Sequence, residues 1–209
     1  MSLASNALCT IEQCKAYLDI GLADTSQDAK LELLINASSS MIENYLDRKL
    51  IHQQYVEYHD GRNSDRLLLK EWPAEKPSEI IFDQTWAYGA TNVIPSENYQ
   101  IESEVMVVLK GYKFPRGNRN IKVTYNAGYQ SPVTLGAGPV LPAELVQAAI
   151  MTVAWQYQLR ADRRLGIASK GKQGESVTFV KGIPIEITMM LDLHYRIEVP
   201  FAEVGVDNG

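Results

Sequence analysis

The strongest constraint on the fold is a helical pattern of apolar residues between Gln27 and Arg48. Apolar side chains recur there three and four positions apart, which places them along one side of an α-helix. Ser38 lies in the middle of this stripe and is small enough to let a neighbouring element approach closely. Such a stripe is typical of a helix that faces a protein core. Its members are Leu31, Leu34, Ile35, Met41, Ile42, Tyr45 and Leu46, whereas most charged residues, Glu43 among them, fall elsewhere.

A shorter helix is predicted before this one, from Thr10 to Leu18. Thr10 and Gln13 have the T-x-x-Q spacing of a capping box, in which the two side chains satisfy free backbone N–H groups at the helix start. The segment Asp24-Thr25-Ser26 then offers N-cap residues for the helix that starts at Gln27.

The middle of the chain, from Ile51 to Tyr129, carries a different pattern. Short extended runs are separated there by turn residues such as Asp60-Gly61 and Trp72-Pro73. This spacing predicts five or six short strands in one compact antiparallel unit. After a loop rich in Gly and Pro, helical spacing returns, with one helix opening at Pro142 and a last one at Pro184.

We therefore predict an α+β fold, in which two N-terminal and two C-terminal helices form a helical bundle and a small antiparallel β unit is inserted between them. The expected parts are residues 1–50 for the N-terminal helices, 51–130 for the β unit, 131–198 for the C-terminal helices and 199–209 for a flexible tail. The segment 166–174 is rich in Gly and Lys and is expected to be a mobile loop.

The balance of charge limits the possible partners. The chain has 209 residues, a net charge of −5 and a pI of about 5.3. Broad binding to nucleic acid requires many contacts between Lys or Arg and phosphate, so an acidic chain is a poor candidate for it. No window approaches the ~20 apolar residues that span a bilayer, and the N-terminus lacks the features of a signal peptide. We expect an intracellular protein without membrane contact.

Catalytic chemistry is not indicated. The sequence lacks G-x-S-x-G, a Walker loop, G-x-G-x-x-G and H-E-x-x-H. His59 and Asp60 are adjacent in a predicted turn, without an orienting partner or a nucleophile. Cys9 and Cys14 offer too few ligands for zinc and are expected to be reduced thiols, one of them half-buried. We predict no catalytic site, no metal and no cofactor, and therefore a protein that is not an enzyme.

Basic residues gather at the predicted end of the first C-terminal helix. Arg160, Arg163 and Arg164 are followed by Lys170 and Lys172. Cations at a helix C-terminus interact favourably with the helix dipole, by roughly 0.3–1 kcal/mol each, and this alone accounts for the cluster. The alternative is a contact with DNA or with an acidic protein surface.

The segment PRGNRN, residues 115–120, is open to two interpretations. A glycine flanked by Arg116 and Arg119 is typical of a loop that binds phosphate or nucleic acid. The segment also lies between two predicted strands, where Gly117 and Asn118 suit a turn with positive φ. We favour a hairpin turn whose solvated tip is available to a neighbouring subunit.

The order of short motifs along the chain resembles a known family. The N-terminal part contains LCTIEQCKAYLDI and DTSQDAKLELLINASSSMIENYLDRKL, the middle contains YVEYHDGRNSDRLLLKEWP and FPRGNRNIKVTYNAGY, and the C-terminal part contains LPAELVQAAIMTVAWQYQLR and PIEITMMLDLHYR. From about Cys9 to Arg196 they resemble the head–tail connector proteins of long-tailed bacteriophages and prophages, also called adaptor or head-completion proteins. Asn63 and Phe114 stand where the family pattern has Gly and Trp, and the segment 85–95 is longer than the pattern.

This resemblance implies a structural role in virion assembly. Such proteins form a ring beneath the portal protein, extend the channel through which double-stranded DNA passes, and present a surface to the tail or stopper protein. The resemblance also implies a location at the head–tail junction of the virion, and in the bacterial cytoplasm during assembly or as a prophage product.

Some residues are candidates for contacts with neighbouring subunits or with the lumen of such a ring. Trp155 can instead serve the core, since large aromatic side chains mostly serve packing. Leu33 and Tyr157 are further outward apolar positions. The alternative function is a nucleic-acid-binding module that uses the region from Arg160 to Lys172. The candidate contacts are Arg160, Arg163, Arg164, Lys170, Lys172, Arg116, Arg119 and Trp155.

Overall fold

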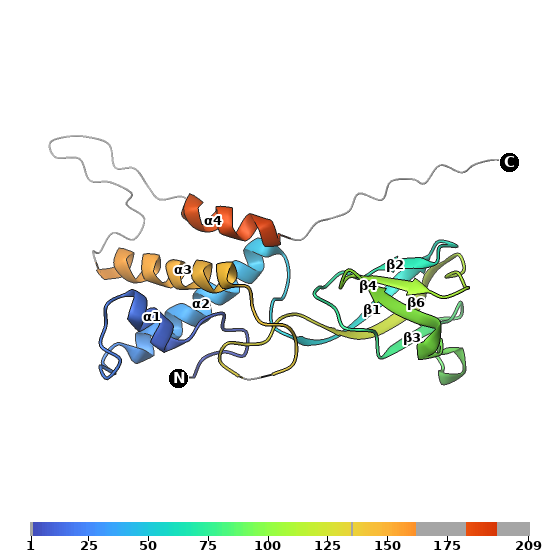
Figure 1. The fold of residues 1–209 in the computed structure, drawn as a ribbon, viewed down its shortest axis with the longest axis horizontal. Helices are drawn as coiled ribbons and strands as arrows, with labels where there is room; N and C mark the ends of the chain where they lie inside the picture. Colours follow the sequence, from blue (N-terminus) through green and yellow to red (C-terminus); the bar gives the residue numbers. More distant parts are fainter. Residues whose placement is uncertain (1, 135, 162–182, 196–209) are drawn as a thin grey trace.

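The helices and the strands of this chain occupy opposite ends of the molecule (Figure 1). The computed structural model describes residues 2–134, 136–161 and 183–195. The helices are α1 (Ile11–Tyr17), α2 (Asp28–Leu46), α3 (Ala143–Ala161) and α4 (Ile185–Leu191), and α4 continues into the 3₁₀ turn η3 (Asp192–His194). The prediction of an α+β fold is therefore confirmed, with helices from both ends of the chain and strands from its middle.

The starts of α1 and α2 are built differently. Thr10 accepts a hydrogen bond from the N–H of Gln13, and the Gln13 side chain accepts one from the N–H of Thr10, so the predicted capping box is confirmed. The N-cap of α2 is Gln27, without a side-chain cap, and the predicted cap at residues 24–26 is wrong. The Asp24 carboxylate instead accepts from the N–H of Ser26 and closes a local turn.

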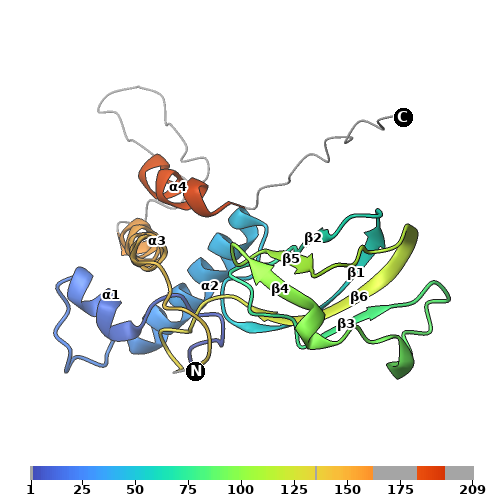
Figure 2. The same cartoon turned by 45° about the vertical axis from the view of Figure 1, so that its right-hand side comes forward.

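The helices pack in layers around α3 (Figures 1 and 2). One side of α3 contacts α1 and α2, and α4 packs on it from another side. The predicted bundle is confirmed only in part, because α4 is a short outer helix on α3. The core takes its residues mostly from one side of each helix: Leu31, Leu34, Ile35, Ile42 and Leu46 of α2, Leu145, Ala148, Ala149 and Val153 of α3, and Ile187 and Leu191 of α4.

The β block consists of two three-stranded sheets, both antiparallel. In the first sheet, the long strand β6 (Gly117–Ala127) lies between β1 (Gln53–Gly61) and β3 (Glu79–Phe82). In the second, β5 (Met106–Leu109) lies between β2 (Arg66–Leu68) and β4 (Tyr99–Glu102). The short 3₁₀ turns η1 (Ala90–Asn92) and η2 (Ser96–Asn98) connect β3 to β4. The single unit expected from the sequence is thus a pair of sheets around one shared core.

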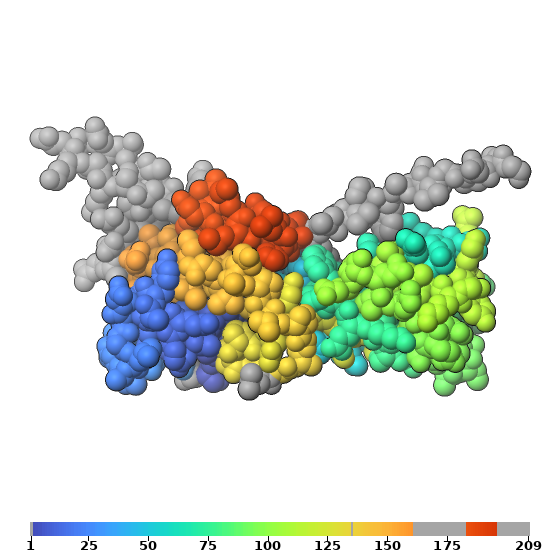
Figure 3. All heavy atoms as spheres, in the orientation of Figure 1, coloured from blue at the N-terminus to red at the C-terminus, as the bar shows by residue number. Residues whose placement is uncertain are grey.

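Each block has its own apolar core. In the space-filling view the helical block and the β block are two adjoining parts of one surface (Figure 3). We infer that residues 51–130 are an inserted unit, and that residues 1–50 and 131–198 supply one helical unit. The expected tail, residues 199–209, lies outside the described residues, as does the predicted mobile loop 166–174.

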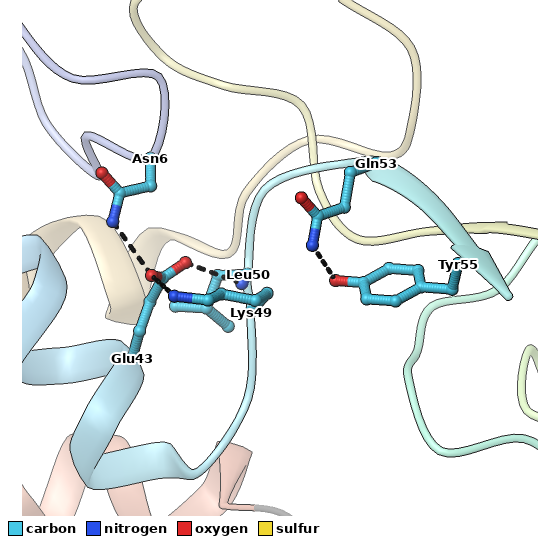
Figure 4. A network of polar contacts seen from close by, with 6 residues as sticks. All are labelled: Asn6, Glu43, Lys49, Leu50, Gln53 and Tyr55. Atoms are coloured by element: carbon cyan, nitrogen blue, oxygen red, sulfur yellow. Dashed lines mark hydrogen bonds and ion pairs between the residues drawn. The ribbon is translucent and has the colours of Figure 1, made fainter. Parts of the chain in front are cut away.

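The C-terminal end of α2 is held by a buried carboxylate (Figure 4). The side chain of Glu43 accepts hydrogen bonds from Asn6 Nδ2 at 2.9 Å and from the N–H of Leu50 at 3.2 Å, and it pairs with Lys49 Nζ at 2.9 Å. The sequence pattern had placed Glu43 outside the buried stripe, and this was wrong because only 3 % of the residue is exposed. Burying a carboxylate is costly unless its oxygens are satisfied, and here three donors satisfy them.

The two chain segments that cross between the blocks lie side by side. The N–H of His52 donates to the carbonyl of Tyr129, and the N–H of Tyr129 donates to the carbonyl of Leu50. Gly128 has a φ of +107°, and a Cβ at this position would lie 2.8 Å from the backbone nitrogen of His52. Both the backbone conformation and the close approach therefore require glycine here.

Replacing Glu43 by Ala should lower the free energy of unfolding by about 3 kcal/mol, because the buried N–H of Leu50 would lose its acceptor along with two further donors. Urea unfolding followed by circular dichroism measures this. The neighbouring exposed residue Asn44, changed to Ala, is the matched control and should shift stability by no more than about 0.5 kcal/mol. Equal effects of the two substitutions would contradict the role of Glu43.

Gly128→Ala should destabilise the protein by about 3 kcal/mol, through unfavourable φ and contact with the neighbouring segment. Gly21→Ala is its control, because a Cβ there meets nothing within 4 Å. Thermal unfolding of both variants, side by side with the unchanged protein, tests whether the crossing segments need this glycine. A Gly128→Ala protein as stable as Gly21→Ala would show that they do not.

Candidate functional site

A cluster of polar side chains inside the β block is the strongest candidate for chemistry. Glu57 lies on β1, and only 8 % of the residue is exposed. Its carboxylate accepts a hydrogen bond from the hydroxyl of Tyr125. His59 follows two positions later on the same strand, and its Nε2 lies 2.7 Å from Glu57 Oε2. The expectation that His59 sits in a turn was wrong, because β1 extends to Gly61. A period of two along a strand places Glu57 and His59 on one face.

The electrostatics of this cluster keep Glu57 ionised. Burial raises the pKa of its carboxyl group, but hydrogen bonds from His59 and Tyr125 outweigh burial, so the pKa lies below its ordinary value. Burial and the bond to Glu57 raise the pKa of Tyr125. Because the N–H of Lys70 also donates to Glu57, the carboxylate is held on several sides. The arrangement is that of a satisfied internal network that stabilises the β core.

The segment PRGNRN does not form the predicted hairpin. The strand before it, β5, pairs with β2 and β4, whereas β6 pairs with β1 and β3, so this segment crosses from one sheet to the other. Positive φ occurs at Arg119 (46°), and Gly117 is the first residue of β6. The hairpin prediction is therefore wrong, because the strands on either side of the segment do not pair with each other. The segment is still a structural connection between strands. Arg116 and Arg119 are both exposed.

A close backbone approach explains the sequence of this crossing. The N–H of Gly61 donates to Asn120 Oδ1, and Asn120 Nδ2 donates to the carbonyl of Pro115. A Cβ on Gly61 would lie 1.8 Å from that carbonyl oxygen. The glycine and the asparagine thus hold β1 against the start of β6, where the register shifts between His59 and Gly61.

Aromatic residues that sequence reasoning left unassigned lie beside this crossing. The longer segment 85–95 contributes Trp86, whose indole N–H donates to the carbonyl of Asn118, and Tyr88, whose ring lies 5.1 Å from that of Tyr58. The guanidinium of Arg119 lies 5.3 Å from the centre of the Tyr58 ring. These contacts fix the added segment to the start of β6, and Trp86 remains 59 % exposed. In the sequence, only the extra length of the segment 85–95 indicated that it has a role of its own.

The remaining predicted contact residues do not come together. Trp155 on α3 is half-buried and lines a hollow of about 210 Å³ with residues of α1 and α4, among them Tyr17 and Ile187. Arg160 is exposed in the last turn of α3, in the helical block, whereas Arg116 and Arg119 belong to the β block. Four further candidates, Arg163, Arg164, Lys170 and Lys172, lie outside the described residues.

The two cysteines are both buried, so the expectation of one half-buried thiol was wrong. Their sulfur atoms lie 3.6 Å apart. The contact with Cys14 and burial raise the pKa of Cys9, which favours the unreactive thiol. Within residues 2–134, 136–161 and 183–195, no three His, Cys, Asp or Glu side chains are placed to hold a metal ion. The helices in the described part of the chain are too short or too polar to cross a membrane.

The fold is shared with chains from gene transfer agent particles. It matches a chain in the neck of a native gene transfer agent particle computed with C12 symmetry, with a TM-score of 0.58 and 16 % identity, covering 97 % of this chain and 96 % of that one. Chains from the neck of the empty particle computed with C6 symmetry and from the virion of the native particle match over the same shares, each with a TM-score of 0.57 and with 17 % and 18 % identity. No curated protein matches the sequence.

The chain itself matches the family described as "Head completion protein" over residues 7–197. It therefore belongs to the head completion protein family, and its role is that of a structural protein of the head–tail connection. This confirms the resemblance drawn from the sequence motifs.

The pH dependence of stability tests the role of Glu57. Its pKa in the folded state lies below the ordinary value of 4.5, so the unfolded chain takes up the proton first as pH falls. The stabilisation is complete above that value and is lost as pH falls through the folded pKa. In Glu57→Gln, stability at neutral pH should fall by about 1–2 kcal/mol, and the decline below pH 4.5 should become shallower. Identical declines in urea unfolding series of both proteins would contradict this.

Proposed function

We propose that this chain is one subunit of a ring at the head–tail junction, set between the portal protein and the tail or stopper protein. The observation that carries the proposal is the family match over residues 7–197. It is supported by a fold shared with chains from particle necks that were computed with C6 and C12 symmetry. The ring would extend the channel for double-stranded DNA, and the subunit would act without catalysis.

The charge of the chain suits this role. A channel wall must let DNA pass without holding it, and a protein with a net charge of −5 repels the phosphate backbone. The exposed cations Arg116, Arg119 and Arg160 are split between the β block and the end of α3. We assign them to local contacts with neighbouring proteins, or with passing DNA, because two separated sites are a poor basis for tight nucleic-acid binding.

The location follows from the same role. The subunit would be made in the bacterial cytoplasm, from a phage or a prophage, and would enter the virion when the filled head is completed. Ring formation requires head-to-tail contacts between two different surfaces of the subunit that close by rotation.

Co-expression with the portal protein of the same phage or prophage tests the proposal. The expected product is a portal complex that carries a ring of this chain, visible in negative-stain images and in light scattering. The chain remaining monomeric in the presence of portal would overturn the ring. Salt-dependent binding of the free chain to DNA fragments at micromolar or lower Kd would instead favour the nucleic-acid-binding alternative.

A further inference from the structure

Helix α4 presents an apolar face to solvent. Ile187 and Leu191 are buried on α3, and the opposite side of the helix carries Ile185, Met189 and, in the following turn η3, Leu193. These three side chains follow one another at intervals of four and are 69 %, 67 % and 82 % exposed. Single exposed apolar residues are ordinary, but a continuous apolar stripe on a surface helix marks an interaction site.

Helix α2 presents a second unusual face. At about 100° per residue, the side opposite its buried stripe is centred on Leu33, which is 50 % exposed. This side carries no charge over the length of the helix, although the solvent side of an amphipathic helix usually carries charged residues. Its exposed members are Ala29, Leu33, Ala37, Ser40 and Asn44. The small side chains leave space on both sides of Leu33 for the side chains of another helix.

These two faces point away from each other. Each helix turns its buried side toward α3, and the C-terminal end of α2 also meets the turn after α4, where the hydroxyl of Tyr45 donates to Asp192 at 2.6 Å (Figures 1 and 2). In the space-filling view, α4 stands out at the edge of the molecule (Figure 3). Two different faces on opposite sides of one subunit are the geometry of a head-to-tail contact, which generates rings or open filaments.

We propose that the α4 stripe of one copy packs on the uncharged α2 face of the next copy. This inference rests on the proposed ring and names its contact: Ile185, Met189 and Leu193 would lie in the shallow surface around Leu33, between Ala29 and Ala37. The partner is a second copy of this chain, and the contact is heterologous.

The charges favour a second copy as the partner. Copies that each carry a net charge of −5 repel one another, so a contact between them is favoured where one of the two faces carries no negative charge. The α2 face meets this condition. The rims have opposite signs, because the exposed residues Glu186 and Asp192 lie beside the α4 stripe and Lys30 borders the α2 face in the first turn of α2. Lys30 Nζ lies 4.1 Å from the centre of the Tyr157 ring of α3, at the edge of that face. A parallel arrangement of the two helices brings these rims together.

Crosslinking between cysteine variants tests the contact. Met189→Cys and Ala37→Cys are mixed, one of them carrying a size tag, and treated with a short bis-maleimide at high protein concentration and in the portal complex. The expected product is the mixed dimer, and the double variant should give a ladder of oligomers. The unchanged protein controls for Cys9 and Cys14, which are buried. Leu68→Cys, at an exposed position of β2, is the matched control partner for Met189→Cys.

Each outcome decides the matter. Met189→Cys that crosslinks to itself indicates an α4–α4 contact and overturns the inference. If the cysteine of Met189→Cys resists maleimide labelling in dilute solution, the chain itself covers this position, and the inference is overturned. If only the portal protein protects this cysteine from labelling, α4 contacts the portal protein, and the inference is likewise overturned. Rings with portal but without the mixed crosslink contradict the contact and leave the ring proposal standing. Mixed crosslinks without any ring support the contact and contradict the ring.

A charge on the α4 stripe provides a second measurement that does not depend on crosslinking. Met189→Glu lies at an exposed position, so its thermal unfolding should match that of the unchanged protein. Self-association in sedimentation should weaken by about tenfold or more, the loss that removal of one well-packed apolar anchor produces. The same substitution at Leu68 should leave association unchanged. An equal loss at both positions would mean that added negative charge alone is responsible.

Discussion

The carboxylate of Glu43 is a buried charge that holds the N-terminal segment and the connection after α2 against this helix. Its donors come from the N-terminal segment through Asn6 and from the connection toward the β block through Lys49 and Leu50. A buried carboxylate that lost these donors would be strongly unfavourable, so the segments that supply them are held in place. The neighbouring Arg48 extends the junction: its guanidinium stacks 3.6 Å from the centre of the Trp72 ring.

This junction also explains why the sequence motifs identify the family. The motif residues Glu43 and Arg48 connect the end of α2 to the segments around it, because Glu43 accepts from the N–H of Leu50 and Arg48 stacks on Trp72. Gly128 lets the two crossing segments touch. Gly61, in another motif, lets β1 approach the carbonyl of Pro115. These residues fix the end of α2, the two crossing segments and the start of β6. At these positions the motifs are therefore markers of the architecture.

The surfaces of the two blocks differ in a way that suits assembly. The helical block has an uncharged face on α2 and an apolar stripe on α4, both turned away from α3. The β block exposes charged side chains and the aromatic segment around Trp86, fixed to the start of β6 by its indole hydrogen bond. In a ring, helical blocks that touch side by side would leave the β blocks available for other proteins. The inserted β unit can then vary in its loops without altering the contact between subunits.

The sequence by itself determined the elements that follow from local periodicity and capping. The stripe of α2, the capping box at Thr10, the succession of helical, extended and helical segments, and the motifs of the family were all readable there, because each depends on residues close together in the chain. Only the tertiary structure decided what depends on distant residues. The inward Glu43 and Glu57 are charged residues that a periodic pattern assigns to solvent, and their burial is favourable only because donors far along the chain reach them. Packing between elements likewise places β5 and β6 in different sheets and turns the outer faces of α2 and α4 away from each other. The spacing of residues along the chain does not predict such packing.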